Sequence, residues 1–390
     1  MGWRAGNGSG IYPNERGLLK QWPEKGPAKL FTIEGLANGY SQPAITENRI
    51  FITGLRDTMD VVMAFDKQGN KLWETPYGKA WIRSYELSRS TPRIEGNRIW
   101  VTSGMAQMAC LDLKTGKVLW HKDLYTLYEG EEATFGYSES PVIWKNLVFY
   151  TIGGKKATVV ALDKTNGKEV WRSEVFDKSA YASPIIINHN GTEMYVNVGA
   201  KFIFALSAKD GKTIWIVDYS HWANPQDTNN NTNNPIYIDG KIVVTSGYDH
   251  GTVQLILSKD GKQVETKWKN EDLDAHHGNI VKVGDYLYGS TWDNNNAGGW
   301  ACIEWKTGKT KYITKWENKG SVISADGMLY CYEERRGNMA LVKPNPEKFD
   351  IISYFRIEGG RGPHWAHPVI DKGILYVRHG DVLNAYDIKN

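Results

Sequence analysis

Histidine, arginine and glutamate side chains gather in the long loops of this chain, many of them just before apolar segments that begin with proline or isoleucine. Imidazole, guanidinium and carboxylate groups can bind metals, hold anions and move protons. Seven of the nine histidines lie in these loops: His221, His250, His276, His277, His364, His367 and His379. The candidate catalytic residues are Arg89, Glu139, His276, His277 and His367.

The same loops carry aromatic and further polar side chains. Aromatic rings mixed with hydrogen-bonding groups suit a pocket for a polar ligand that also has apolar faces, such as a sugar. The candidate ligand-binding residues are Arg83, Tyr137, Trp222, Trp292, His364 and Trp365.

Three interpretations of the polar cluster are open at this stage. In the first, histidines hold a transition metal such as zinc or manganese, with Glu139 or water completing the site. In the second, Arg89 and Glu139 act with a histidine as an acid–base set on a sugar. In the third, these side chains bond one another and water. The candidate metal ligands are His276, His277, His364 and His367.

Two asparagine-rich loops, 227–234 and 293–299, are predicted to lie on the surface. The first begins as Asp-x-Asn-x-Asn, like a calcium-binding loop. It lacks the glycine at the sixth position and the glutamate at the twelfth that such a loop requires, so calcium remains a weak alternative.

A repeated phrase reveals the elements that must position these residues. It consists of an apolar strand ending in Asp, a lysine-containing turn with Gly, and a second strand carrying Trp. Full copies span 64–73, 110–120, 161–171 and 205–215, and weaker copies span 255–262, 302–309 and 340–348. Such a phrase predicts a β-hairpin whose Asp fixes the turn and whose Trp packs on the neighbouring unit. A period of about 40 to 50 residues indicates a repeat architecture.

A second hairpin precedes each copy, so every repeat supplies four antiparallel strands, the unit of a propeller blade. The hairpin pairs begin at Pro43, Pro92, Pro141, Pro184, Pro235, Ile280, Ile323 and Pro368. The last blade lacks its outer strand, which residues 28–35 can supply. The prediction is therefore an all-β, eight-bladed propeller forming one domain, 1–390, with a lead-in segment at 1–27.

Strand order inside a blade sorts the loops onto two faces. The loop before each inner strand and the loop between the second and third strands share one face, here called the loop face. The tight turns lie on the opposite side, here called the turn face. All the long loops, and with them the candidate residues, are expected on the loop face.

Composition narrows the function classes. The 47 basic and 44 acidic residues give a net charge of only +3 and form no runs, which argues against nucleic acid and an anionic membrane as partners. No apolar run has the length of a membrane span. The N-terminus has no apolar signal-peptide core, so we expect either a cytoplasmic protein or a mature form. No hydrolase elbow, phosphate loop or zinc-protease motif is present.

The three cysteines have no metal-ligand spacing. Cys110, Cys302 and Cys331 all fall in strand contexts. We expect buried, free thiols, with a disulfide between Cys302 and Cys331 as the alternative.

The pattern Ala-x-Asp-x-x-Thr-Gly-Lys-x-x-Trp resembles the repeat of the pyrroloquinoline quinone (PQQ) dehydrogenase-like propellers, which include quinoprotein alcohol dehydrogenases and the assembly scaffold BamB. The resemblance covers the whole chain. The stretches 3–11 and 17–23 look like the opening of a bacterial, exported subgroup of PQQ-binding-like propellers. This chain has neither the adjacent Cys-Cys pair of the dehydrogenases nor a Cys-x-x-Cys-His haem motif.

The resemblance implies a periplasmic or otherwise extracytoplasmic protein, with PQQ plus calcium or a transition metal as cofactor options. We expect a monomer that binds a polar ligand, with carbohydrate favoured, or a protein partner through the loop face around the central channel. The alternatives are a PQQ-dependent or other sugar-active enzyme, of dehydrogenase or lyase type, and a BamB-like assembly scaffold.

Overall fold

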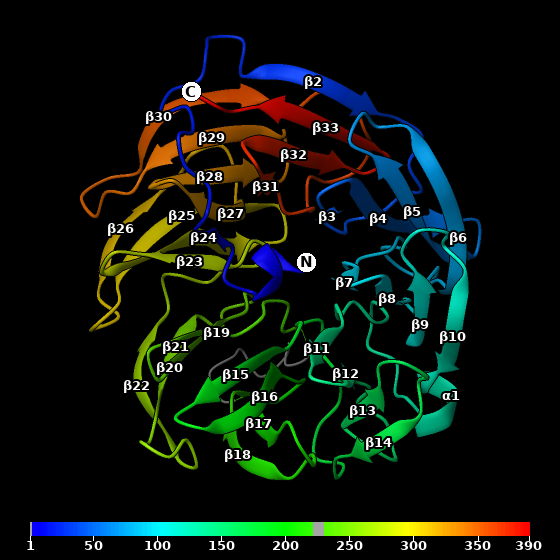
Figure 1. The fold of residues 1–390 in the computed structure, drawn as a ribbon. Helices are drawn as coiled ribbons and strands as arrows, with labels where there is room; N and C mark the ends of the chain where they lie inside the picture. The colour runs from blue at the N-terminus through cyan, green and yellow to red at the C-terminus, as the bar shows by residue number, and fades with distance from the viewer. Residues whose placement is uncertain (1, 221–229) are drawn as a thin grey trace.

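The computed structural model describes residues 2–220 and 230–390. Eight sheets follow one another around a central axis, with the N-terminal segment near the middle of the ring (Figure 1). The predicted eight-bladed, all-β propeller is confirmed. Two residues singled out in the sequence, His221 and Trp222, lie outside the described residues.

The first four blades follow the chain from their inner to their outer strands. The first contains β3 (Ala44–Ile45), β4 (Arg49–Arg56), β5 (Met59–Asp66) and β6 (Lys71–Lys79). The second contains β7 (Arg93–Glu95), β8 (Arg98–Thr102), β9 (Gln107–Asp112) and β10 (Val118–Asp123), followed by helix α1 (Leu124–Tyr128). The third contains β11 (Val142–Trp144), β12 (Leu147–Thr151), β13 (Val159–Asp163) and β14 (Glu169–Arg172). The fourth contains β15 (Ile185–His189), β16 (Thr192–Val198), β17 (Phe202–Ser207) and β18 (Thr213–Asp218).

The remaining blades continue this order. The fifth contains β19 (Ile236–Ile238), β20 (Lys241–Thr245), β21 (Thr252–Leu257) and β22 (Val264–Asn270). The sixth contains β23 (Ile280–Val283), β24 (Tyr286–Asn294), β25 (Ala297–Glu304) and β26 (Thr310–Thr314). The seventh contains β27 (Gly320–Ala325), β28 (Met328–Glu333), β29 (Asn338–Lys343) and β30 (Asp350–Arg356).

The eighth blade closes the ring with a strand from the other end of the chain. Its inner strands are β31 (Val369–Asp371), β32 (Ile374–His379) and β33 (Val382–Asp387), and its outer strand is β2 (Ala28–Ile33). β2 pairs antiparallel with β33, from Ala28 opposite Asp387 to Ile33 opposite Leu383. The predicted closing strand is therefore confirmed, and it covers a sheet edge that would otherwise be open.

The repeated Gly and Trp form the contact between blades. Gly116 has a φ of +72°, and a Cβ there would lie 2.5 Å from the ring of Trp73 in the preceding blade. The same contact joins Gly167 to Trp120 and Gly211 to Trp171. The turn glycine therefore allows both the left-handed backbone and the close approach of the ring. Its aspartate is also structural, because the Asp112 carboxylate accepts a hydrogen bond from the Thr115 backbone N–H at 2.8 Å.

The lead-in segment enters the central channel, which the sequence did not reveal. Strand β1 (Ile11–Tyr12) pairs in parallel with the inner strand β27, and the short 3-10 turn η1 (Arg4–Gly6) lies further in. Arg4 is fully buried there. Gly10, at a φ of +69°, lies so close to Arg4 that a Cβ would fall 2.2 Å from its Nη2 atom. The channel is thus occupied by the protein's own chain.

Two further expectations concern thiols and membranes. All three cysteines are free and buried, so the alternative of a Cys302–Cys331 disulfide is not realised. Within residues 2–220 and 230–390, no helix has the length and apolar character needed to cross a membrane.

Candidate functional site

A ring of equivalent positions surrounds the channel mouth. Each lies three residues before the Pro or Ile that opens an inner strand. In blade order the residues are Tyr40, Arg89, Ser138, Tyr181, Thr232, His277, Gly320 and Trp365. All except Gly320 line one cavity of about 300 Å³ on the loop face. The structure therefore brings together residues that lie hundreds of positions apart in the sequence.

The cavity is completed by loops between strands and by the lead-in segment. The remaining lining residues are Trp3, Tyr85, Phe135, Ser140, Ser183, Asn230, Tyr248, His276, Asn295, Asn296 and His367. No aspartate or glutamate is among the described lining residues. Four of the candidate catalytic residues, Arg89, His276, His277 and His367, and the candidate ligand-binding residue Trp365 meet here.

Trp3 lines this cavity, and the next residue, Arg4, is fully buried. The Trp3 indole N–H donates to Asn234 Oδ1 at 2.8 Å, and its ring packs edge-on against His367 with 4.7 Å between the centroids. Arg4 donates to the carbonyls of Val322 at 3.0 Å and Ile280 at 2.8 Å. Burial lowers the pKa of Arg4 to about 9. Sequence reasoning missed both residues because the lead-in does not share the repeat.

Arg89 projects into the cavity from the second blade. Its Nη1 donates to the Phe135 carbonyl at 2.6 Å, and its Nη2 donates to the Tyr85 carbonyl. Burial lowers the pKa of the guanidinium from its usual value. Arg89 is thus held by two neutral acceptors on the cavity rim.

His276 and His277 form a pair of neutral imidazoles. Their ring centroids are 3.6 Å apart, and His277 also contacts Trp365 at 4.8 Å between centroids. His276 Nε2 shares a hydrogen bond with the Tyr248 hydroxyl at 2.9 Å. Burial lowers the pKa of His276 well below its ordinary value. Burial, with the charges of Lys319 and Arg89, lowers the pKa of His277 to about 3.

His367 has both ring nitrogens engaged. Its Nδ1 lies 2.9 Å from Arg4 Nη1, which can only donate, so Nδ1 is the acceptor. Its Nε2 lies 2.8 Å from the His277 carbonyl and therefore carries the proton. This arrangement fixes the neutral tautomer, and burial favours it by lowering the pKa of His367. Neither nitrogen is available to a ligand without breaking a bond.

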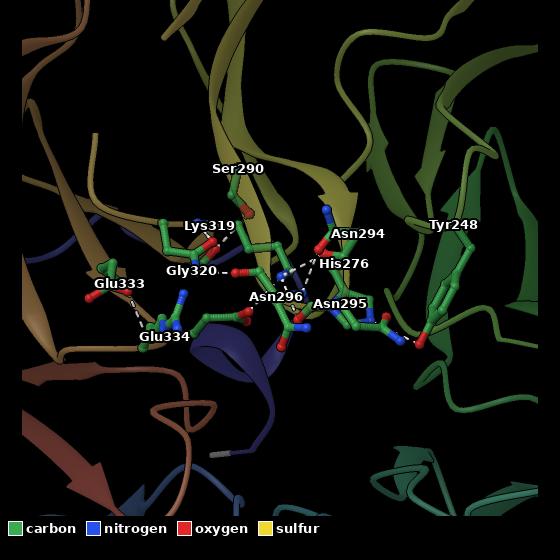
Figure 2. Close-up of polar contacts among 12 residues, drawn as sticks. Tyr248, His276, Ser290, Asn294, Asn295, Asn296, Lys319, Gly320, Glu333 and Glu334 are labelled. Atoms are coloured by element: carbon green, nitrogen blue, oxygen red, sulfur yellow. Dashed lines mark hydrogen bonds and ion pairs between the residues drawn. The ribbon is translucent and has the colours of Figure 1, made fainter. Parts of the chain in front are cut away.

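A buried ion pair supports the asparagine-rich loop at 293–299. Lys319 Nζ lies 2.7 Å from Glu334 Oε1 and donates to the carbonyls of Asn294 and Asn295 at 3.1 Å each. Figure 2 shows Lys319 and Glu334 on one side of Asn295 and Asn296, and Tyr248 on the other. Lys319 is fully buried. Residues 293–296 are exposed, as predicted for a surface loop, and Asn295 and Asn296 also line the cavity.

Glu139 and Tyr137 face away from the cavity. The Glu139 carboxylate accepts from the Thr151 backbone N–H at 3.0 Å and from Asn197 Nδ2 at 3.2 Å, and its residue is 3% exposed. Burial raises the pKa of Glu139 to about 8. The Tyr137 hydroxyl donates to backbone carbonyls, at 3.1 Å from those of Glu131 and Ile152. Because extended chain alternates its side chains, Ser138 and Ser140 face the cavity instead.

The other described candidate ligand-binding residues do not line the cavity. His364 is bonded to the Tyr332 hydroxyl and stacks on His379 at 3.6 Å. Trp292 packs on Tyr248, 5.2 Å between centroids. Arg83 is exposed and pairs with Glu132. Trp222, like His221, falls outside the described residues.

The proposed metal ligands do not form a cluster. Among the described residues, no group of three or more His, Cys, Asp or Glu side chains is placed to hold a metal ion. His367 has no free nitrogen, and His364 lies in a separate contact with Tyr332.

The described lining residues also fit PQQ with calcium poorly. PQQ is a planar tricarboxylate, and calcium takes six to eight oxygen ligands that usually include carboxylates. The described lining offers no carboxylate and only one cationic side chain, Arg89. We therefore derive no redox step through this group.

Comparisons with known proteins agree with the fold. A family model described as outer membrane protein assembly factor BamB matches residues 58–314. BamB from Moraxella catarrhalis is 15% identical with a TM-score of 0.65, covering 93% of this chain and 98% of that one. A europium-containing methanol dehydrogenase is 12% identical with a TM-score of 0.70, covering 95% and 88% of the two chains. At these identities the likeness concerns the fold alone.

Curated relatives include two dehydrogenases. The quinoprotein alcohol dehydrogenase PedH of Pseudomonas putida is 27% identical over 159 residues, or 38% of this chain and 26% of the relative. The quinoprotein ethanol dehydrogenase of Pseudomonas aeruginosa is 24% identical over 244 residues, or 60% and 32%. The matches thus span no more than about a third of these relatives. Since the BamB model matches more than half of the chain, this protein belongs to the BamB family of β-propellers with PQQ-like repeats.

Proposed function

We propose that the protein binds a carbohydrate in the loop-face cavity. The observation that carries this proposal is the composition of the lining, which combines the rings of Tyr40, Tyr181 and Trp365 with neutral hydrogen-bonding groups. Aromatic faces pack on the C–H faces of a sugar, and amides and hydroxyls bond its hydroxyls. Asn295, Asn296 and Thr232 can supply such bonds.

The size of the cavity supports a small ligand. At about 300 Å³ it lies at the lower end of the range for small-molecule sites. This volume suits one or two sugar rings better than a long chain bound along its length. The Lys319–Glu334 ion pair helps to hold this side of the cavity in place, because Lys319 also donates to the backbone carbonyl of Asn295.

The placement of ionisable groups favours binding over turnover. The acid–base set considered from the sequence needs Glu139 beside Arg89, but the Glu139 carboxylate is bonded to Thr151 and Asn197 behind the lining. His367 is locked by two hydrogen bonds. A general acid or base must reach the proton it transfers, and neither group reaches the cavity as a free donor or acceptor.

The test is calorimetric titration of the purified protein with neutral and acidic mono- and disaccharides. We expect saturable binding that is weakened at least about tenfold in Trp365→Ala, since a buried aromatic contact contributes on the order of 1–3 kcal/mol. Tyr354→Ala is the control, because that ring is 57% exposed on the outer strand β30. Absence of binding to every sugar, or equal binding by Trp365→Ala, would contradict the proposal.

A protein partner is the second candidate. The rim residues Ile82 and Tyr85 are 49% and 64% exposed, which gives the loop face apolar groups beside the cavity. The family description, an outer membrane protein assembly factor, supports this alternative. Crosslinking of extended peptides to a photoreactive group at position 82, competed by excess peptide but not by sugar, would favour the partner over the carbohydrate.

We further propose an extracytoplasmic location. The support is the family description, which places BamB in outer membrane assembly. Cell fractionation of the source organism with antibodies against the loop face tests this. Recovery with cytoplasmic markers would contradict it.

A further inference from the structure

We infer that the ligand is an acidic saccharide and that its carboxylate binds to Arg89. This inference rests on the proposed carbohydrate binding and adds the charge class of the sugar. It also assigns Arg89 the role of selecting an acidic sugar over the neutral sugar of the same shape.

Arg89 occupies a position that its repeat leaves otherwise uncharged. The seven equivalent residues of the other blades are Tyr40, Ser138, Tyr181, Thr232, His277, Gly320 and Trp365. Burial keeps His277 neutral by lowering its pKa to about 3. One blade therefore places a fixed positive charge where the rest place rings, hydroxyls or no side chain.

The Arg89 guanidinium has N–H groups that make no hydrogen bond to a described residue. An arginine carries five N–H groups, and Arg89 uses one on each Nη for the carbonyls of Phe135 and Tyr85. No described residue accepts from the other three. Unlike the fully buried Arg4, Arg89 is only half-buried and lines the cavity. A carboxylate matches the geometry of two parallel N–H donors of arginine.

The surroundings leave this charge without an anionic partner in the cavity. No described lining residue is an aspartate or glutamate. The carboxyl group whose charge acts on Arg89 is that of Asp60, which is 1% exposed and accepts from the Gly104 backbone N–H at 2.7 Å. Burial raises the pKa of Asp60 to about 7, so its negative charge is disfavoured.

Further buried cations lie just behind the lining. Arg4 and Arg378 are both fully buried and donate to backbone carbonyls, with no direct ion pair to a carboxylate among the described residues, although the charge of Asp381 acts on Arg378. Lys319 is the exception, because Glu334 offsets its charge. Since the field of unpaired cations is weakly screened inside a protein, it favours an anion in the cavity.

The aromatic residues of the lining stand beside Arg89 around the same cavity. Trp365 packs on Tyr40 with 4.9 Å between centroids and on His277 with 4.8 Å. Tyr40 and Arg89 stand at equivalent positions of neighbouring blades, and the charge of Arg89 lowers the pKa of the Tyr40 hydroxyl against the larger effect of burial. A sugar ring on these faces would therefore have its carboxylate within reach of the guanidinium.

The experiment compares sugars that differ only at C6. Galacturonate and glucuronate are titrated against galactose and glucose, which carry a hydroxymethyl group in place of the carboxylate. We expect one of the acids to bind at least about tenfold more tightly than its neutral counterpart, in line with a charge-assisted hydrogen bond. Arg89→Gln should remove most of this preference, and Arg89→Lys should retain part of it.

Arg336→Gln is the matched control, because Arg336 is exposed, pairs with Glu317 and does not line the cavity. It should leave the preference unchanged, and thermal unfolding checks that each variant folds. Equal binding of acid and neutral sugar, or a preference that survives Arg89→Gln, would overturn the inference while leaving the proposed function intact. Absence of binding to all four sugars and to their disaccharides would instead remove the proposed function itself.

Discussion

The two faces of the ring each have a hollow, and they differ in how their polar groups are used. The turn-face hollow is larger, about 700 Å³, and is lined by residues 12–17, 42–45 and 369–373 with both chain ends. There the Glu15 carboxylate accepts from the backbone N–H groups of Lys372 and Gly373 at 2.8 Å each. The loop-face cavity is about 300 Å³, yet its arginine has unused donors.

This difference teaches that chemistry, not volume, distinguishes a candidate binding site in this fold. The turn face uses its charged side chains to fasten the lead-in segment to the eighth blade. The loop face presents aromatic rings to the cavity, together with N–H donors of Arg89 that no described residue accepts from. Between them lies the lead-in, which contributes Trp3 to one hollow and Ala5 to the other.

The largest effect is expected on the free energy of unfolding when Arg4, which holds the lead-in segment between the two hollows, is removed. Arg4→Ala leaves the carbonyls of Gly278, Ile280 and Val322 without this donor. Each buried unsatisfied group costs about 1–3 kcal/mol, so we expect unfolding free energy to fall by about 3 kcal/mol or more. Chemical denaturation measures this.

The control for Arg4 is Arg16→Ala on the turn face. Arg16 is exposed and donates to the neighbouring Glu15 carbonyl, so its loss should change stability by no more than about 0.5 kcal/mol. If Arg4→Ala were as mild as Arg16→Ala, the lead-in would not be a structural part of the channel.

A smaller effect is expected when Glu139, whose carboxyl group is buried behind the cavity lining, is changed: the pH dependence of stability should weaken. Burial raises the folded-state pKa of Glu139 to about 8, while an unfolded glutamate titrates near about 4.3. The folded state therefore holds its proton more tightly, and stability falls as pH rises between about 4.5 and 8. Glu139→Gln cannot ionise and should flatten this fall by at least about 1 kcal/mol, the equivalent of roughly one pKa unit.

Unfolding curves at pH 5, 6.5 and 8 measure the slope for wild type and Glu139→Gln. An unchanged slope would mean that Glu139 ionises normally and is reached by water. The carboxyl group would then be a candidate for the cavity after all.

The smallest effect is expected when a charged residue of the turn face is removed and sugar binding is measured. Lys372→Ala removes an exposed lysine whose partner, Glu47, is 3.6 Å away across the turns. Because this charge lies in the other hollow, we expect an unchanged dissociation constant for any sugar that binds. A loss of about threefold or more in titration would show that the comparison between the faces is wrong.

The fold could be predicted from the sequence because each residue type in the repeat has one local structural role. Gly116 and Trp73 show why: a left-handed turn and a flat ring specify both the hairpin and its packing on the next blade. The closing strand was predictable because β33 pairs with β32 in its own repeat but has no outer strand there, and β2 supplies it.

The site was only partly predictable, because a shift of one residue in extended chain decides whether a side chain points into the cavity or away from it. Glu139 and Ser138 are adjacent, and only the serine lines the cavity. Sequence reasoning grouped them in one loop but could not choose between them. The equivalence of positions three residues before each inner strand was available as a signal, whereas Trp3 and Arg4 lie in a segment without any repeat.

The most direct test of the central claim is a crystal structure with the saccharide that binds most tightly in titration. We predict ligand density in the loop-face cavity, with the sugar ring on Trp365 and a polar substituent at Arg89. Density in the turn-face hollow, or on the outer strands with the cavity empty, would contradict the account.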